Sequence, residues 1–221
     1  MKILSAFIYY LKSIPTLVFN TNFWVIPIVL IKQPILLKTS KKFNFYVNSL
    51  LSIWTVKEVV LDCCYESFNK LKKGNVVIDV GASIGDFSIL ASRKASKVYG
   101  IEMKEELVKL FKKNIIINQA KKIKIINQRL ISLDRLFYQY KISRCDFLKI
   151  DCEGSEYEIF KNTSPETLKK IKYITFEIHL FDNKMKKNYL WLKKFLLKNK
   201  FILKELDNSV HDYIKFLFCK K

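Results

Sequence analysis

Three acidic residues follow short apolar runs of this 221-residue sequence, each where a buried strand should end. Asp79 lies in "VVIDV", Glu102 closes "VYGIE" and Asp151 closes "DFLKID". The carboxyl ends of parallel strands meet at one edge of a sheet, where open α/β folds bind their ligands. The three carboxylates are therefore expected to lie around one pocket.

The stretch "VVIDVGASIGDFSIL", Val76 to Leu90, passes from an apolar strand through two glycines into a second apolar segment. Gly81 allows a tight turn, and Gly85 allows a helix or ligand to approach where a Cβ would otherwise stand. Backbone N–H groups at the start of the next helix then face the pocket. Ser83 is counted with the two glycines as a cofactor-binding residue.

The acids before and after this turn discriminate between cofactors. Asp79 would repel a pyrophosphate but suits the ammonium group of an amino-acid moiety, whereas Glu102 can accept hydrogen bonds from both ribose hydroxyls. This pair favours S-adenosylmethionine over NAD, and the absence of GKS or GKT after the turn excludes Walker-A chemistry. The competing interpretation is a purely structural turn, with Glu102 solvated at a strand end.

A second polar group follows the next two strands. Asp151 and Glu153 come after "FLKI", and Glu177 and His179 lie two residues apart in "KYITFEIHL", on one face of a strand. We expect these four side chains at one rim, with Glu153 contacting the acceptor. His179 is the candidate general base because imidazole titrates near neutral pH, and Glu177 could orient its ring. Asp151 is the alternative base, or it could hold a divalent cation together with Glu153.

From residue 73 onwards, short apolar segments alternate with amphipathic ones, which is typical of a parallel sheet covered by helices. The predicted strands are Val76–Val80, Val98–Glu102, Ile123–Asn127, Phe147–Asp151, Tyr173–Ile178, Phe201–Leu206 and Tyr213–Cys219. The predicted helices are Asp86–Ala95, Glu105–Asn118, Ser155–Lys161 and Met185–Lys198. Glu156 and Glu158 are interpreted as solvated acids favoured by a helix N-terminus.

Only "DNSVHD" separates the last two predicted strands, which is too short for a helical crossover, so these strands must pair antiparallel. A mostly parallel seven-stranded sheet with an antiparallel last strand is the α/β, Rossmann-like layout of class I methyltransferases. The fully parallel dinucleotide dehydrogenases lack it.

Residues 1–72 are predicted to form an N-terminal appendage to the cofactor-binding domain, which spans residues 73–221. Residues 35–48 have the pattern of a hairpin, and Trp54–Leu71 has the pattern of a helix. The uncharged run from residue 13 to 31 contains two prolines and two asparagines, which disfavour a membrane span. We expect an amphipathic helix packed on the main domain; the alternatives are peripheral membrane contact through residues 1–33 and a true span.

The net charge of +20 raises the question of an anionic partner. Among the 40 basic residues, arginine is scarce, although arginine is the usual reader of phosphates and bases. We therefore interpret the charge as compositional bias and expect a small-molecule or glycan acceptor, not nucleic acid. Five cysteines without a CxxC pair indicate reduced thiols and a cytoplasmic protein, and neither they nor the two histidines have metal-ligand spacing.

The segments "VVIDVGASIGDFSIL", "YGIEM", "SLDRL", "DFLKIDCEGSEYEIF" and "ITFEIH", in this order, resemble the FkbM-type S-adenosylmethionine-dependent methyltransferases over roughly residues 40–180. The resemblance implies O-methylation of a hydroxyl on a glycan, lipid or secondary metabolite. It places Asp79 and Glu102 with the glycine turn on the cofactor side, and the four rim residues on the reaction side. The sequence departs from the family at residues 129–132, which replace a longer segment that usually walls the adenine and the acceptor.

Two other functions stay open. A nucleic-acid methyltransferase is one, although no Asn/Asp-Pro-Pro-aromatic turn for stacking a flipped base follows "KIDCEG". A degenerate methyltransferase fold that binds a ligand without catalysis is the other.

Overall fold

The computed structural model describes residues 2–208 and 210–221, and its centre is a seven-stranded sheet with the strand order β5-β4-β3-β6-β7-β9-β8. The strands are β3 (Val76–Val80), β4 (Lys97–Glu102), β5 (Ile123–Asn127), β6 (Cys145–Ile150), β7 (Ile171–His179), β8 (Ile202–Asp207) and β9 (Ile214–Lys220). β9 runs antiparallel to both of its neighbours, β7 and β8, while the pairs from β5 to β7 are parallel. The predicted class I fold is confirmed, with the antiparallel strand inserted inside the sheet.

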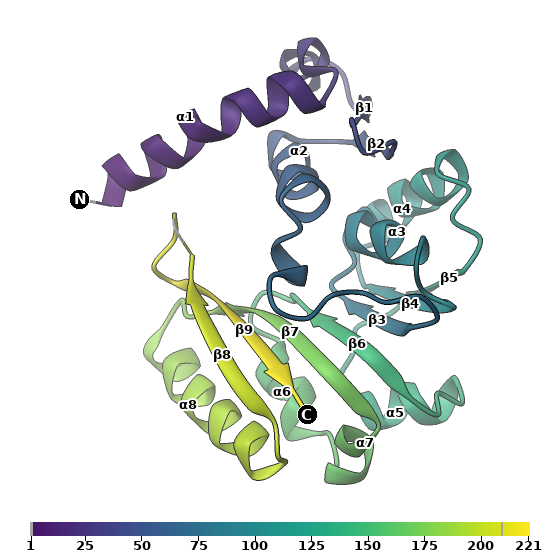
Figure 1. The fold of residues 1–221 in the computed structure, drawn as a ribbon, viewed down its shortest axis with the longest axis vertical. Helices are drawn as coiled ribbons and strands as arrows, with labels where there is room; N and C mark the ends of the chain where they lie inside the picture. The colour runs from purple at the N-terminus through teal and green to yellow at the C-terminus, as the bar shows by residue number, and fades with distance from the viewer. Residues whose placement is uncertain (1, 209) are drawn as a thin grey trace.

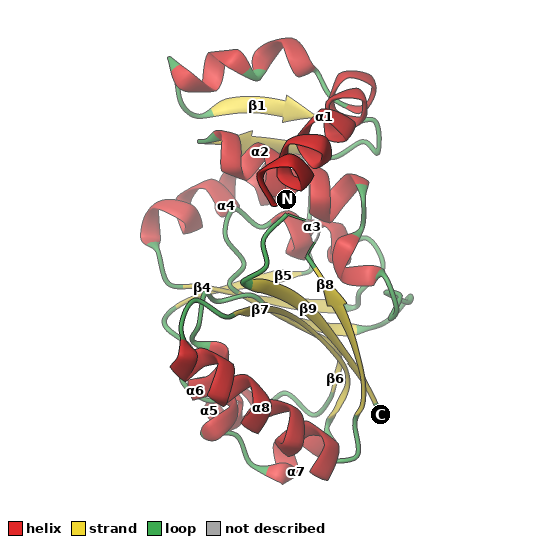
Figure 2. Ribbon diagram, turned by 90° about the vertical axis from the view of Figure 1, so that its left-hand side faces the viewer, coloured by secondary structure: helices red, strands yellow, loops and turns green. Residues whose placement is uncertain are grey.

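Helices cover both faces of the sheet (Figures 1 and 2). One face carries α5 (Leu133–Gln139), α6 (Glu156–Lys161), α7 (Pro165–Lys169) and α8 (Asn183–Lys198). The other carries α3 (Asp86–Ser92), α4 (Glu105–Ile117) and the N-terminal part of the chain. Phe147 and Leu148, neighbours in β6, belong to two different hydrophobic clusters, because successive strand residues point to opposite faces.

The N-terminal segment, described from residue 2 to 72, lies beyond α3 and α4 (Figure 2). It consists of α1 (Lys2–Asn20), two short 3₁₀ turns (Phe23–Val25 and Pro27–Leu30), the hairpin β1 (Ile35–Lys38) with β2 (Asn44–Val47), α2 (Leu50–Val56) and the turns that follow α2. Leu37 and Phe45 of the hairpin are buried in the same cluster as Val77 of β3. The segment therefore shares one hydrophobic core with the sheet.

The helix predicted over Trp54–Leu71 forms only as far as Leu61. α2 ends at Val56, one π-helical turn (Lys57–Leu61) follows, and Cys63 then takes a left-handed φ of 57° that breaks the helix. The chain crosses to the sheet with only a 3₁₀ turn at Cys64–Glu66. Beyond Leu61, the buried residues Tyr65 and Leu71 do not belong to a continuous helix, so the apolar spacing there did not require one.

α1 packs against α2 and the π-helical turn, which belong to the same N-terminal segment. Lys57 Nζ donates to Ser13 Oγ at 3.0 Å, and the Tyr10 ring meets the Trp54 ring edge-on with 4.9 Å between centroids. Within the described residues, we find no helix whose length and apolarity would suffice to cross a membrane.

Candidate active site

The glycine turn joins β3 to α3 at the carboxyl edge of the sheet. Gly81 has a φ of 75° and Gly85 a φ of 88°, left-handed values that glycine adopts readily. A Cβ on Gly81 would lie 1.6 Å from the Asp151 carbonyl oxygen, and one on Gly85 would lie 2.0 Å from the Phe111 ring. The turn fits between β6 and α4 because both positions lack a side chain.

Glu102 ends β4 beside this turn and lines a cavity together with Gly81 and Ser83. Its Oε2 accepts a hydrogen bond from the Ser83 N–H at 2.9 Å, and its Oε1 accepts one from the Lys104 N–H at 2.8 Å. A carboxylate offers about four lone-pair sites, so each oxygen retains one for a ligand hydroxyl. This arrangement fits the predicted contact with ribose.

Asp79 lies elsewhere than expected. Its side chain is 0% exposed, its Oδ2 accepts from the Ser88 hydroxyl at 2.7 Å, and its Oδ1 lies 3.2 Å from Lys149 Nζ. Asp79 is not among the residues that border the cavity. Direct contact with a ligand ammonium group therefore does not fit its position, because Lys149 already occupies that side of the carboxylate.

Lys149 connects the glycine turn to the reaction rim. Its Nζ donates to the Gly81 carbonyl at 2.7 Å and lies 3.5 Å from Asp151 Oδ2. Burial alone would lower the pKa of Lys149, but the charges of Asp79 and Asp151 outweigh it and raise that pKa above its ordinary value. The buried ammonium consequently stays charged and holds the turn against β6.

The rim itself is built from neighbouring parallel strands, with Asp151 after β6 and Glu177 on β7. The Tyr65 hydroxyl lies 2.9 Å from Asp151 Oδ2 and 3.1 Å from Glu177 Oε2. Burial raises the pKa of Glu177 to about 8, and the negative charge of Asp151 adds to the rise. Burial and both carboxylates also raise the pKa of Tyr65, so its hydroxyl keeps the proton that it donates.

His179 lies two residues beyond Glu177, with its Nε2 at 3.7 Å from Glu177 Oε1. The side chain is largely enclosed, since the residue is 5% exposed, and the ring packs against Phe181 with 5.3 Å between centroids. Its Nδ1 is buried without a hydrogen-bond partner. Glu177 and His179 are thus brought together as expected, at a separation longer than a hydrogen bond.

The acids after β6 divide into exposed and buried positions. Glu153 is exposed, has a φ of 50° and borders the cavity. Glu158 is exposed and pairs with Arg129 at 2.6 Å. Glu156 corrects the expectation of a solvated acid: it is buried, accepting backbone N–H bonds from Gly154 at 2.8 Å and from His179 at 3.4 Å. These two donors replace water and fasten the loop to β7.

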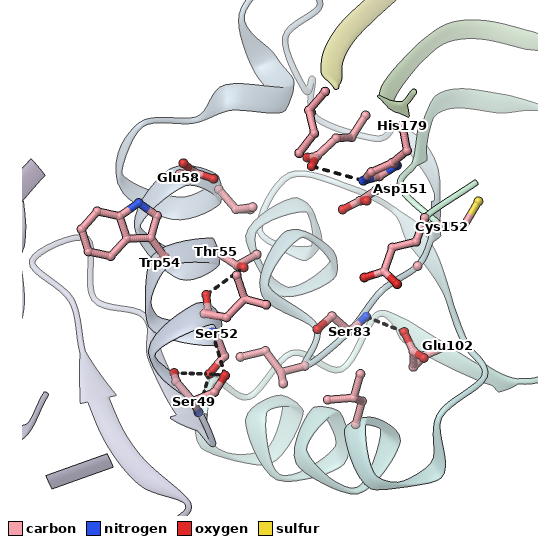
Figure 3. A pocket seen from close by; sticks show the side chains of 18 of the residues that line it. Ser49, Ser52, Trp54, Thr55, Glu58, Ser83, Glu102, Asp151, Cys152 and His179 are labelled. Atoms are coloured by element: carbon pink, nitrogen blue, oxygen red, sulfur yellow. Dashed lines mark hydrogen bonds and ion pairs between the residues drawn. The ribbon is translucent and has the colours of Figure 1, made fainter. Parts of the chain in front are cut away.

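A cavity of about 860 Å³ joins the cofactor side and the rim (Figure 3). Glu102 and Ser83 lie on one side of it, and Asp151 and His179 on another. The N-terminal segment supplies a further wall that contains Tyr9, Tyr10, Ser49, Trp54, Thr55 and Glu58. The Tyr9 hydroxyl donates to Glu58, which lies in the π-helical turn, and such turns occur frequently at functional sites.

The short connection after β5 also borders this cavity, through Gln128, Arg129 and Leu130. The Arg129–Glu158 ion pair ties it to α6 across the acid-rich loop. A compact wall is therefore present at the place where the sequence departs from the family pattern.

Two residues of the site, Tyr65 and Lys149, were not identified from the sequence. Lys149 carries a usable signal, since a lysine between Leu148 and Ile150 interrupts a strand that is buried on both faces. Tyr65 carries none, because its partners lie 86 and 112 residues further along the chain.

Two family models match this chain. Residues 117–217 match the model described as the methyltransferase FkbM domain, and residues 66–153 match the TRM5/TYW2 methyltransferase domain. Among curated proteins, one described as an uncharacterized RNA methyltransferase of Caldanaerobacter subterraneus subsp. tengcongensis is 36% identical over 89 residues. That match covers 39% of this chain and 20% of the relative, so the chain spans a fifth of the relative's length.

Solved structures share the fold. SMU.1697c of Streptococcus mutans, determined in complex with SAH, has a TM-score of 0.56 and 14% identity, covering 68% of this chain and 90% of that chain. Methyltransferase FkbM of Methylobacillus flagellatus KT has a TM-score of 0.56 and 15% identity, covering 70% of this chain and 45% of that one. The predicted fold and the predicted resemblance are confirmed.

Proposed function

We propose that this chain, which resembles the FkbM-type S-adenosylmethionine-dependent methyltransferases, methylates a hydroxyl on a glycan, lipid or secondary metabolite. The observation that carries the proposal is that one cavity is bordered both by the glycine turn with Glu102 and by Asp151, Glu177 and His179. Cofactor and acceptor would meet between these two groups.

The cofactor side has the features that S-adenosylmethionine requires. When bound, this cofactor supplies an activated methyl group on a sulfonium. Glu102 would accept hydrogen bonds from the ribose hydroxyls through the lone pairs that Ser83 and Lys104 leave open. Asp79 would act from below the turn, by holding Lys149 against the Gly81 carbonyl.

The wall supplied by the N-terminal segment suits a hydroxyl-rich acceptor. Tyr10 and Trp54 present aromatic surface, while Ser49, Thr55 and Glu58 offer hydrogen-bonding groups to the same cavity. Mixed aromatic and polar linings fix a ligand's orientation through a few directional contacts on an apolar base. A sugar or another polyol combines the apolar faces and hydroxyls that such a wall can recognise.

The rim would take the proton that an acceptor hydroxyl loses as its oxygen forms the new bond to carbon. His179 is the first candidate for this general base and Asp151 the second, since both border the cavity. A positioned base contributes typically about 10²–10⁴-fold, and alignment of the reacting atoms supplies much of the remaining acceleration.

The proposal is tested by incubating the protein with methyl-labelled S-adenosylmethionine and separated glycan, lipid, metabolite and RNA fractions from the organism of origin. Calorimetry with S-adenosylmethionine is run in parallel. We expect cofactor binding and label in a ribonuclease-resistant glycan, lipid or metabolite product. Cofactor binding without label in any fraction would instead support the non-catalytic alternative, and absence of cofactor binding would contradict both.

Methylation of RNA is the second candidate. It is favoured by the description of the curated relative as an RNA methyltransferase and by the net charge of +20, which complements a phosphate backbone. Label that ribonuclease releases would establish this candidate and overturn the glycan, lipid or metabolite acceptor.

A further inference from the structure

We propose that Asp151, Glu177 and His179 form a binding site for one divalent cation of the kind that accepts both carboxylate and imidazole ligands, with Mn²⁺ as the representative. Its use in catalysis rests on the proposed transfer to a hydroxyl, whereas the binding itself does not. The sequence alone gave Asp151 and Glu153 as an alternative cation pair, but Glu153 lies in the exposed loop outside this cluster.

The geometry brings one ligand atom from each of the three residues within 4.8 Å of the others. Metal–ligand bonds of about 2.1–2.3 Å place ligand atoms roughly 3–4.5 Å apart, so a movement of a few tenths of an ångström closes the set. Asp151 follows β6, and Glu177 and His179 alternate on the adjacent parallel β7, which fixes all three at one edge. Carboxylate oxygens suit Mg²⁺ and Mn²⁺, and an added imidazole favours a transition metal.

Of the two carboxylates in this cluster, only Asp151 has a positively charged side chain beside it among the residues that the structure describes. Lys149 lies between Asp79 at 3.2 Å and Asp151 at 3.5 Å. Within the described part of the chain, no lysine or arginine lies at ion-pair distance from Glu177. The Tyr65 hydroxyl has one hydrogen to share between Asp151 and Glu177. Two half-buried carboxylates thus face each other with a single donor between them.

His179 provides an independent indication. Its side chain is almost fully buried, yet within the described residues neither ring nitrogen makes a hydrogen bond: Nδ1 has no partner and Nε2 lies 3.7 Å from Glu177. Buried polar side chains are normally hydrogen-bonded, so each unpaired one calls for an explanation. A cation held jointly by this imidazole and the two carboxylates would give one of the two ring nitrogens a partner.

With three protein ligands, such a cation would keep open positions toward the cavity, where an acceptor hydroxyl could coordinate. Coordination makes the hydroxyl more acidic. Its oxygen then forms the bond to the methyl carbon, the sulfur–carbon electrons return to sulfur, and the hydroxyl proton passes to solvent. Because Lys149 opposes a cation next to Asp151, we expect moderate affinity.

The test is titration of the chelator-treated full chain with Mn²⁺. Binding is measured as the loss of the electron paramagnetic resonance signal of the free ion. We expect one saturable site per chain, weakened at least tenfold in both Glu177→Gln and His179→Ala. Glu158→Gln is the matched control, because it removes the same charge from an exposed position on the adjoining helix. Circular dichroism melting establishes that each variant is folded, and competition by Mg²⁺ on the wild type gives a measurement independent of any variant.

Absence of binding at millimolar Mn²⁺, or equal binding by all three variants, would overturn the site. Methyl transfer that persists in EDTA, together with absent Mn²⁺ binding, would reject the cation and leave the proposed function intact. Mn²⁺ binding that depends on Glu177 and His179, without transfer to any acceptor fraction, would support the site and count against the proposed function.

Discussion

Individual side chains in this site act through shared partners. Lys149 touches the Gly81 carbonyl, Asp79 and Asp151, so the cofactor turn and the rim are joined by one ammonium group. Tyr65 joins Asp151 to Glu177 in a similar way. Substitution of Lys149 would disturb both the cofactor turn and the rim, and substitution of Tyr65 would disturb both rim carboxylates. The roles of single residues are therefore best measured at the periphery of these contacts.

Glu102 is one such residue. Glu102→Ala should weaken S-adenosylmethionine binding by about 1.5–3 kcal/mol, because a charged hydrogen-bond pair to ribose is lost. Glu105→Ala removes the same charge from the exposed first turn of α4, where the side chain is 73% exposed, and should leave affinity unchanged. Calorimetry on both variants measures the difference, and equal affinity of wild type and Glu102→Ala would contradict the assignment.

His179→Ala should lower turnover at least a hundredfold while the dissociation constant of the cofactor stays within about twofold of wild type. This loss of turnover is expected in both cases, if the imidazole takes the acceptor proton and if it holds a cation. Once an acceptor is known, single-turnover kinetics and calorimetry separate the two quantities. A loss below tenfold would transfer the role to Asp151.

At the scale of elements, the strands were predictable and the connections were not. β3 and β5 begin and end where the apolar runs do. β3 is buried on both faces, which gives it a distinctive apolar composition. α5 and α7, of seven and five residues, were missed. Their capping residues, Ser132 and Ser164, were the available signals.

Gly85 allows a prediction about the start of α3. Gly74 and Gly85 both have positive φ, but a Cβ on Gly74 would meet nothing within 4 Å, whereas one on Gly85 would meet the Phe111 ring. Gly74→Ala should therefore cost about 1–2 kcal/mol of unfolding free energy from left-handed strain alone. Gly85→Ala should cost at least about 3 kcal/mol, because overpacking adds to that strain. Urea unfolding compares the two, and equal losses would show that the contact with Phe111 is unimportant.

Asp86 opens α3 and makes stability depend on pH. Burial raises its pKa from 3.8 to about 7, and its Oδ2 has no hydrogen-bond partner. Between these values the folded chain retains a proton that the unfolded chain releases, so this group's contribution is fully present below about pH 4 and is lost as pH rises toward 7.

Asp86→Asn removes this titration. The stability of the variant relative to wild type should increase by on the order of 2 kcal/mol between pH 5 and pH 8. Urea unfolding at the two pH values measures the change. If the variant and the wild type differed in unfolding free energy by the same amount at both pH values, Asp86 would be ionised throughout this range.

At the scale of the whole molecule, the N-terminal segment is part of the enzyme's cavity and shares the core of the sheet. Its hairpin was predictable from alternating apolar residues, but its place over α3 and α4 was not, because long-range packing leaves no local pattern. The rim residues were predicted because the ends of strands can be recognised in a sequence. The contact between Tyr65 and Glu177 was not predicted, because it too depends on long-range packing.

Tyr10 tests whether the N-terminal segment recognises the acceptor. Tyr10→Ala should raise the acceptor KM roughly three- to tenfold, the value of a lost aromatic contact, without altering cofactor affinity. Tyr138→Ala is the matched control, because Tyr138 is 88% exposed on α5 and does not border the cavity. An unchanged KM in Tyr10→Ala would assign α1 a purely structural role.

The position of Tyr65 also sets the order in which the site can assemble. Its hydroxyl meets Glu177 across a separation of 112 residues, and the strand that carries Glu177 is itself paired with β9 from the end of the chain. Closing so long a loop is entropically expensive and follows the formation of local contacts. A nascent chain can therefore form the glycine turn long before it has a complete rim, and the reaction centre should be among the last parts of the molecule to mature.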